Sequence, residues 1–198
     1  KLLPVIRPRY IVDGGDCLDN RKNSRHPPLG YIDEPNVGEE IEANELRRQE
    51  IKDASPSSDL IWLPGNHCRR FDAHLAQNVP MYQGVKGSRL EPPFPEWDFV
   101  PSVCFNDTLF VIHKWRGGMH ADQNNALWSG MSVITGHQHN AKKSYISDLR
   151  GVRQGVKAPT LADRFGPQFD YTETAPLNWQ EGFLVAHIDG PRCHIEEV

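Results

Sequence analysis

Residues 131–139 read MSVITGHQH, and this stretch governs the interpretation of the whole chain. Its first five residues form a largely β-branched run that predicts a strand, and Gly136 predicts the turn that ends it. In an extended segment alternate side chains point the same way, so we expect His137 and His139 to enter one cavity. Because imidazole is the commonest metal ligand at neutral pH, the pair predicts a metal site. Two surface histidines are the alternative.

The same arrangement, a short apolar run followed by a ligand-type side chain, occurs three more times upstream. Ligands collect at the carboxyl ends of strands in α/β sheets, so we expect all four strand ends to converge on one site. Carboxylate, amide and imidazole ligands without thiolate suit Mn, Fe, Zn or Ni better than a cysteine-rich zinc site does. For Asp16, an acidic turn residue is the alternative. The expected strands and the side chains that follow them are 10–12 with Asp16, 60–63 with Asn66, and 108–112 with His113.

The composition is that of an ordinary folded protein. With 198 residues, 38% of them hydrophobic and 24% charged, the chain is long enough for one domain, which we expect to span 1–198. No apolar run is long enough to span a bilayer, and the net charge of −4 argues against a protein that coats nucleic acid. The first residues are too short and proline-broken for a secretory signal. The four cysteines form no Cys-x-x-Cys pair, which predicts reduced thiols in a cytoplasmic protein.

Three helices are expected between the strands. The first, over 37–53, is highly charged and is predicted to face solvent, with Ile41, Leu46 and Ile51 as sparse apolar anchors. Shorter helices are expected over 69–77 and 121–129.

The helix over 121–129 stands between two expected strands, and this order predicts a βαβ crossover. Leu127 and Trp128 are its candidates for the inward face. Near the end of the chain, the runs 182–188 and 193–198 predict a hairpin, whose histidines are expected on a sheet face. The segments expected to be irregular are 21–36, 78–101 and 158–178.

The ordered set of motifs resembles that of the calcineurin-like metallophosphoesterases. Their pattern is Asp-x-His, Gly-Asp-x-x-Asp, Gly-Asn-His-Asp/Glu, a histidine after a strand, and Gly-His-x-His. Four of these five motifs occur here in the same order, over residues 10–140, and the tail 178–183 is similar to phage and prophage members. The resemblance implies an α/β fold, a four-layer α-β-β-α sandwich of two mixed sheets. The matching stretches are Gly15–Asp19, Gly65–Cys68, Val111–His113 and Gly136–His139.

The resemblance implies a role for each matching residue. Two divalent metal ions are implied, with Mn expected first and Fe, Zn, Ni or Co as alternatives. His67 would stabilise the phosphoryl oxygen or protonate the leaving group, whereas Asp19 would orient a ligand or serve only as a turn residue. Asn66 and Arg69 are the expected substrate-binding residues. Both Arg69 and Arg70 are candidates for contact with phosphate, and a solvated helix start is the alternative for both. The implied metal ligands are Asp16 as the bridge, Asn66, His113 and His137 for one ion, and His139 for the other.

Three positions depart from the family pattern. The Asp-x-His motif is absent, so we expect a chain truncated at its N-terminus or one that has lost this motif. The second ion would then keep only Asp16 and His139, which predicts one well-held ion and a depleted partner site. Cys68 replaces a carboxylate and is expected to weaken His67 as an acid unless another carboxylate substitutes, while the thiol itself either packs or binds metal. Lys114 replaces a glycine and either adds charge for phosphate or points outward.

The function that these motifs imply is hydrolysis of a phosphodiester or a phosphomonoester by a metal-activated water. The expected substrate is a small-molecule or nucleic-acid phosphate ester, with no membrane partner. The alternative is a catalytically impaired family member that binds a phosphate-containing or nucleic-acid partner. A plain structural domain is a third interpretation, which the ordered motifs disfavour. His26 and His120 lie near the motifs and are expected either to line the pocket or to be structural.

Overall fold

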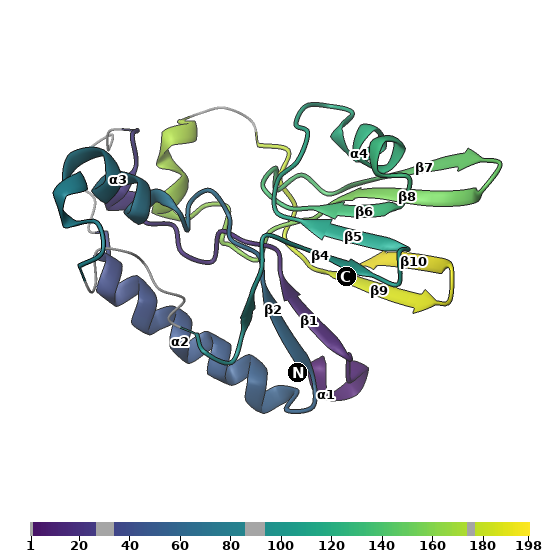
Figure 1. Cartoon of the computed structure of the whole chain (residues 1–198), viewed down its shortest axis with the longest axis horizontal. Helices are drawn as coiled ribbons and strands as arrows, with labels where there is room; N and C mark the ends of the chain where they lie inside the picture. Colours follow the sequence, from purple (N-terminus) through teal and green to yellow (C-terminus); the bar gives the residue numbers. More distant parts are fainter. Residues whose placement is uncertain (1, 27–33, 86–93, 174–176) are drawn as a thin grey trace. The chain divides into compact units, whose positions relative to one another are not determined.

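The computed structural model describes residues 2–26, 34–85, 94–173 and 177–198. The chain divides into two compact units, residues 1–100 and residues 101–198, and each has its own sheet (Figure 1). Helices and multi-strand sheets occur together in this chain, so the predicted α/β class is confirmed. The four-layer sandwich and the single domain over 1–198 stay predictions.

The sheet of the first unit has three described strands, and all of them run parallel. They are β1 (Tyr10–Asp13), β2 (Asp59–Trp62) and β3 (Asp98–Phe99), in that order across the sheet. The two longer strands agree with the runs expected at 10–12 and 60–63. The third was not predicted, because a two-residue strand is too short to show any alternation. Because the strands are parallel, the residues that follow β1 and β2 lie at the same edge of this sheet.

Helix α2 (Val37–Ala54) agrees with the helix predicted over 37–53. Asn36 caps its N-terminus: the Asn36 side chain accepts from the backbone N–H of Glu39 at 3.1 Å, and the Glu39 carboxylate accepts in return from the backbone N–H of Asn36 at 2.7 Å. This reciprocal capping box satisfies two donors that a helix N-terminus otherwise leaves unpaired. Of the predicted apolar anchors, Ile41 and Ile51 pack against the core, but Leu46 is 66% exposed, so that assignment was wrong.

Arg48 takes the inward position that Leu46 was expected to hold. Its guanidinium carbon lies 4.9, 4.1 and 4.2 Å from the ring centroids of Trp62, Phe94 and Trp97, and the side chain is almost fully buried. The carboxylate of Asp13, the last residue of β1, pairs with this buried charge. A buried guanidinium is stable only when it is paired, and its flat face suits aromatic rings. A helix whose charged sequence predicts exposure to solvent therefore packs on the sheet through one of its charged residues.

The rest of the first unit is formed by short helices. Helix α3 (Arg70–Asn78) agrees with the helix predicted over 69–77. The segments expected to be irregular contain two single-turn helices, and residues 27–33 and 86–93 of those segments lie outside the described residues. The short helices of this unit are α1 (Leu3–Ile6), η1 (Arg21–Asn23) and η2 (Pro80–Tyr82).

The second unit is built on a mixed sheet of five strands. Across the sheet the order is β4-β5-β6-β8-β7, and the central strands β5, β6 and β8 run parallel while β4 and β7 pair antiparallel at the two edges. Helix α4 (Ala121–Ser129) connects β5 to β6, so the predicted βαβ crossover is confirmed. The strands are β4 (Ser102–Phe105), β5 (Leu109–Ile112), β6 (Ser132–Thr135), β7 (Lys142–Asp148) and β8 (Gly151–Lys157).

Helix α4 packs on this sheet (Figure 1). The face that it buries is not the predicted one. Leu127 and Trp128 are 50% and 66% exposed, so the expectation that they face inward was wrong. The reason lies at Gly155 on β8, where an added Cβ would stand 1.8 Å from the carbonyl oxygen of Asp122. The helix backbone comes so close to the sheet that only short side chains fit between them. The buried face consists of Ala121, Asp122, Asn125 and Ala126.

The last two strands, β9 (Leu184–Asp189) and β10 (Arg192–Glu197), form the predicted closing hairpin. His187 and His194 lie directly opposite each other on it, and both are exposed, as expected for sheet-face histidines.

The hairpin of β7 and β8 was not predicted, because its polar sequence resembles a loop. The irregular segment 158–178 contains η3 (Pro167–Thr172), and residues 174–176 are not among those described. Among the described helices, none has the length and apolarity required to cross a bilayer.

Candidate functional site

The first group of candidate residues lies in the first unit, in the segments that follow β1 and β2. We call it the Asp16 cluster; it consists of Asp16, Asp19, Asn66, His67 and Arg70. Asp16 has a φ of 63°, a left-handed conformation that aspartate tolerates better than most residues. This conformation turns its carboxylate toward the loop after β2, where the backbone N–H of His67 donates to Oδ1 of Asp16 at 2.8 Å.

Gly65 permits this close approach. A Cβ at position 65 would stand 1.9 Å from Oδ1 of Asp16 and 2.4 Å from its backbone nitrogen. Any side chain there would collide with both the carboxylate and the backbone of Asp16, so only glycine fits. The glycine after β2 therefore allows the two strand ends to meet.

His67 is held between a carboxylate and a guanidinium. Its Nδ1 lies 2.6 Å from Oδ1 of Asp19, and Nη2 of Arg70 lies 2.8 Å from its Nε2. Arg70 also donates to Oδ1 of Asp19 at 3.0 Å and to the Asp19 carbonyl at 2.8 Å. Because arginine can only donate, Nε2 of His67 must accept, and the ring proton then resides on Nδ1 and is donated to Asp19. The network thus assigns a neutral imidazole with a fixed tautomer.

The expectation for Cys68 was conditional on whether another carboxylate substitutes, and this network contains one. The loss of a carboxylate at position 68 does not leave His67 without an acidic partner, because Asp19 provides one from the loop after β1. Of the two roles weighed for Asp19, the structure supports orientation of a neighbouring side chain, and that side chain is His67. The sequence could not choose between them, because Asp19 and His67 are 48 positions apart.

The structure distinguishes the two neighbouring arginines that precede and begin α3. Arg69 is exposed, whereas Arg70 is half-buried and contacts both His67 and Asp19. The helical spacing of three residues between positions 67 and 70 is the signal that sequence reasoning missed. Asn66 is exposed on the loop between Gly65 and His67. Substrate contacts by Asn66 and Arg69 stay predictions.

Two cysteines directly follow residues of the Asp16 cluster: Cys17 follows Asp16, and Cys68 follows His67. Nη2 of Arg48 donates to Sγ of Cys17 at 3.0 Å. Interaction with the Cys68 side chain, followed by burial, raises the pKa of Cys17 well above its usual range. Interaction with the Cys17 side chain lowers the pKa of Cys68 to about 7, although burial acts in the opposite direction. Cys68 belongs to the hydrophobic core, which supports the packing role weighed for it.

The second group of candidate residues lies in the second unit and is called here the histidine cluster; it consists of His113, His137 and His139. His113 follows β5 and is 5% exposed, and His137 follows β6. The parallel strands end in register, with Ile112 opposite Thr135, so the residues after them emerge at one edge. The rings of His113 and His137 stand edge to face, with centroids 5.4 Å apart and an interplanar angle of 73°.

The segment that carries His137 and His139 is not extended, so the alternation argument was wrong. His137 and His139 have φ values of 69° and 58°, which place both in the left-handed region. Left-handed conformations are costly for residues with a Cβ, and such conformations gather at functional sites. The two imidazoles consequently have different neighbours.

His139 packs against aromatic rings. Its imidazole stacks on the indole of Trp179, with centroids 4.9 Å apart and an angle of 30°, and meets the ring of Phe169 edge-on at 5.9 Å. The His139 carbonyl also accepts from the backbone N–H of Gln180 at 3.0 Å. Trp179 and Gln180 belong to the tail 178–183, so this tail contacts His139.

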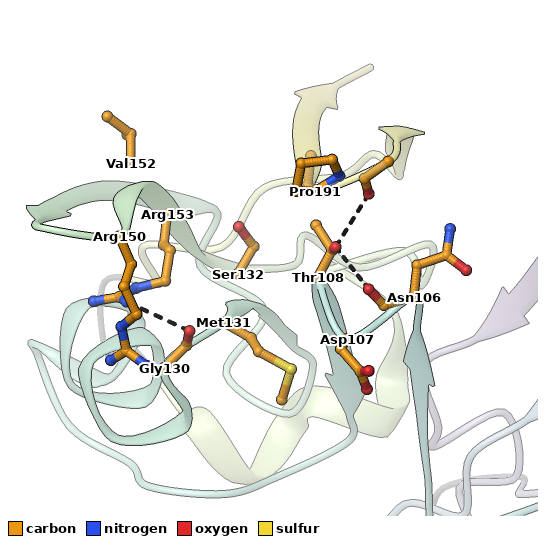
Figure 2. A pocket seen from close by; sticks show the side chains of 12 residues that line it. Asn106, Asp107, Thr108, Gly130, Met131, Ser132, Arg150, Val152, Arg153 and Pro191 are labelled. Atoms are coloured by element: carbon orange, nitrogen blue, oxygen red, sulfur yellow. Dashed lines mark hydrogen bonds between the residues drawn. The ribbon is translucent and has the colours of Figure 1, made fainter.

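Other residues near the motifs point to solvent. Lys114, His26 and His120 are all exposed, which agrees with the outward and structural alternatives weighed for them. The second unit also contains a cavity of about 540 Å³ (Figure 2), and no residue of the histidine cluster is among those that line it. Its lining includes Thr108, Ser132 and Arg153, which lie where strands of the sheet begin, whereas His113 and His137 follow the ends of strands. None of the predicted site residues lines this cavity.

No protein-family model, curated protein sequence or solved structure matches this chain. The case for a metal centre therefore depends on the donor chemistry of the residues themselves. Asp16, His113 and His137 each offer a ligand atom suited to a divalent ion. Carboxylate and imidazole together fit Mn, Fe or Zn.

Proposed function

We propose that this protein is a metal-dependent phosphoric ester hydrolase of the calcineurin-like metallophosphoesterase type. The ligands we propose for its metal centre are those that the resemblance implies. The observation that carries the proposal is the network of Asp19, His67 and Arg70 next to Asp16. It joins a proposed metal ligand, an oriented imidazole and a cation, three groups that metal-assisted phosphoryl transfer can use.

The proposed ligands divide between two ions. Asp16, Asn66, His113 and His137 would hold the first ion, and Asp16 with His139 would hold the second, more weakly. Mn is the expected metal, with Fe, Zn, Ni or Co as alternatives. When bound, such ions lower the pKa of a coordinated water and neutralise charge on the phosphoryl group.

Arg70 and His67 would act on the substrate in turn. A guanidinium is suited to pair with two phosphoryl oxygens. When Arg70 turns to a phosphate, it releases Nε2 of His67, which then faces the ester. Asp19 keeps the imidazole in place, and His67 would donate a proton to the leaving oxygen. The cluster as described is then the resting arrangement, closed by Arg70.

The substrate class we propose is a phosphodiester or a phosphomonoester, carried by a small molecule or a nucleic acid. A cytoplasmic location belongs to the same proposal and accords with four free cysteines. The second candidate is a catalytically impaired protein that binds a phosphate-containing or nucleic-acid partner. The contact between Arg70 and Nε2 of His67 is the observation that favours it, because a histidine held there cannot donate a proton.

The test is hydrolysis of bis(p-nitrophenyl) phosphate and p-nitrophenyl phosphate with added Mn²⁺, with chelator, and by the variant His137→Ala. His187→Ala is the matched control, since this histidine is exposed on the closing hairpin. We expect hydrolysis that needs Mn²⁺, is lost in His137→Ala and is retained in His187→Ala. Mn²⁺ binding without hydrolysis of either ester would reject the enzyme in favour of the binding protein. Hydrolysis that survives chelation would reject the metal mechanism.

A further inference from the structure

Helix α4 and the loop before it expose large aromatic side chains that the proposed chemistry does not use. Trp115 in the loop and Trp128 in the helix are both exposed, although tryptophan is mostly buried in folded proteins. Lys114 and Arg116, on either side of Trp115, are exposed as well. We call the surface formed by Lys114, Trp115, Arg116 and Trp128 the tryptophan surface. Exposed apolar groups that gather in one place mark sites of interaction.

The tryptophan surface is held rigidly by contacts between the loop and the helix. The guanidinium carbon of Arg116 lies 4.0 Å from the ring centroid of Trp128. Asn125, which is 1% exposed, accepts from the backbone N–H of Arg116 at 3.2 Å and donates to the Arg116 carbonyl at 3.3 Å. The ring of Trp115 meets that of Phe110 edge to face, with centroids 5.9 Å apart. Both tryptophans are therefore ordered before any ligand arrives, which lowers the entropy cost of binding.

The charge of the tryptophan surface is positive. In the described part of the chain, neither Lys114 nor Arg116 forms an ion pair with a carboxylate. The single carboxylate between positions 113 and 130 is that of Asp122, which is buried and pairs with Lys142 at 3.3 Å. The net charge of −4 belongs to the whole chain and leaves this local charge in place. An anionic ligand is therefore the occupant that complements the surface.

One end of the tryptophan surface lies next to the histidine cluster. Lys114 directly follows His113 in the sequence. A Cβ at Gly117 would stand 3.7 Å from Nε2 of Gln138, the residue that separates the two histidines after β6. A ligand that extends along the surface therefore reaches the histidine cluster.

We propose that the tryptophan surface binds a single-stranded nucleic acid and that this strand is the substrate of the proposed hydrolase. Unpaired bases stack on aromatic rings whatever their sequence, and lysine and arginine pair with the phosphates between them. The binding follows from the surface alone, whereas the role of the strand as substrate rests on the proposed function. A duplex offers no free base faces, so we expect it to bind more weakly. Stacking and phosphate contacts do not involve the 2′-hydroxyl, so DNA and RNA strands should bind alike.

The first experiment measures binding of fluorescein-labelled oligothymidine and oligouridine to the whole chain by fluorescence anisotropy, with EDTA present so that no strand is cut. Trp128→Ala should lower the affinity roughly 5- to 150-fold, the effect of losing one stacked base. Phe165→Ala is the matched control and should bind as the wild type does. Phe165 is also an exposed ring of the second unit with an arginine 4.8 Å from its centroid, but that arginine, Arg164, pairs with Glu181 at 3.7 Å.

The salt dependence of the same binding tests the phosphate contacts. In Lys114→Gln the slope of log affinity against log salt concentration should become shallower by about 0.7, because one phosphate contact is lost. Equal affinity of Trp128→Ala and wild type, no binding of either strand, or a duplex bound as tightly as the strands would overturn the proposal. A dimer in sedimentation that Trp128→Ala dissociates, without binding of either strand, would assign the surface to contact between copies of the chain instead.

The last experiment adds Mn²⁺ and follows cleavage of the strands beside hydrolysis of the p-nitrophenyl esters. We expect the strands to be cut, with KM raised in Trp128→Ala by the factor by which its affinity falls. If the strands bind but neither they nor the esters are hydrolysed, the proposed enzyme fails and the nucleic-acid surface stands. If the esters are hydrolysed but neither strand binds, the enzyme stands and the surface fails. Strands that bind and stay intact while the esters are hydrolysed would overturn their role as substrate.

Discussion

The Asp16 cluster and the histidine cluster are held in place by different forces. In the first unit, His67 is fixed by hydrogen bonds to two charged partners, Asp19 and Arg70, within a network of polar contacts. In the second unit, the imidazoles are packed against rings, His113 against His137 and His139 against Trp179. Polar contacts fix direction and protonation, whereas ring packing and backbone conformation fix position.

This difference agrees with the chemistry we propose for each cluster. A proton donor must keep its tautomer and its orientation, and only directional partners can secure both. A metal ligand needs a nitrogen lone pair at a set position, and packing together with a rigid backbone can hold it there. Removing a charge should therefore harm the Asp16 cluster most, and removing a ring should harm the histidine cluster most.

The largest effect is expected at Gly65, because the Asp16 cluster depends on contact between two loops. In Gly65→Ala the new methyl group would collide with the backbone and carboxylate of Asp16. We expect a loss of unfolding free energy at or above the usual ~1–3 kcal/mol for overpacking, measured by urea denaturation, together with loss of Mn²⁺ binding. Gly14→Ala is the control, since nothing lies within 4 Å of a Cβ there. Equal stability of the two variants would show that the loops do not meet as described.

The second largest effect is expected for Arg70→Ala, and comparison of its kcat with that of Arg69→Ala tests which of the two arginines acts on the substrate. Arg70→Ala should lower kcat roughly 10- to 100-fold, because His67 loses one of the partners that orient it and the phosphate loses a cation. Arg69→Ala, which removes an exposed neighbour, should leave kcat near that of the wild type. The measurement is ester hydrolysis as a function of pH, because an altered His67 shifts the acidic or basic limb of the profile. A larger loss of kcat in Arg69→Ala than in Arg70→Ala would support Arg69 as the substrate-binding arginine.

A smaller effect is expected at Trp179, which belongs to the histidine cluster. Trp179→Ala removes the ring on which His139 stacks, an interaction of about 0.5–1.5 kcal/mol. We expect weaker binding of the second ion and little change for the first, measured by Mn²⁺ titration. Trp128→Ala is the control, because Trp128 is an exposed residue of α4. If Trp179→Ala abolished binding of both ions, the division of ligands between them would be wrong.

The smallest effect is expected at Asp122, a buried carboxylate of the second unit outside the histidine cluster. Burial alone would raise the pKa of Asp122, but hydrogen bonds from Ser144 and Lys142 outweigh it, and the net pKa is lowered. Because the folded state holds the charged form, this stabilisation is complete above the unfolded pKa of about 3.9 and is lost as pH falls through the lower folded value. The advantage of the wild type over Asp122→Asn in unfolding free energy should shrink over that window. An advantage that stays constant with pH would contradict the shift.

The sequence predicted the elements that have a clear pattern. The helices over 37–53, 69–77 and 121–129, the strands over 10–12, 60–63, 108–112 and 131–135, and the closing hairpin were all recognisable, because apolar runs and turn residues mark them. The hairpin of β7 and β8 was missed because its residues are mostly polar. Apolar periodicity cannot reveal a strand whose place in the sheet is secured by backbone pairing with neighbours.

The candidate site was less accessible to sequence reasoning than the fold. The motifs gave the residues, but not the partners that fix them. Asp19 reaches His67 across 48 positions, and Arg48 enters the core from a helix that reads as solvated. Both are contacts between polar groups distant in sequence, and no local pattern encodes them. The left-handed conformation of His137 and His139 was equally hidden, because it depends on the surroundings of the loop.

The most direct test of the central claim, that Asp16 and His137 are ligands of a bound metal ion, is a calorimetric titration with Mn²⁺. It compares the wild type with Asp16→Asn and with His137→Ala, after circular dichroism has shown that both variants are folded. We predict that each substitution alone abolishes tight binding, because both side chains hold the same ion. Wild-type affinity in Asp16→Asn, with binding lost only in His137→Ala, would contradict the claim and restrict the site to the histidine cluster.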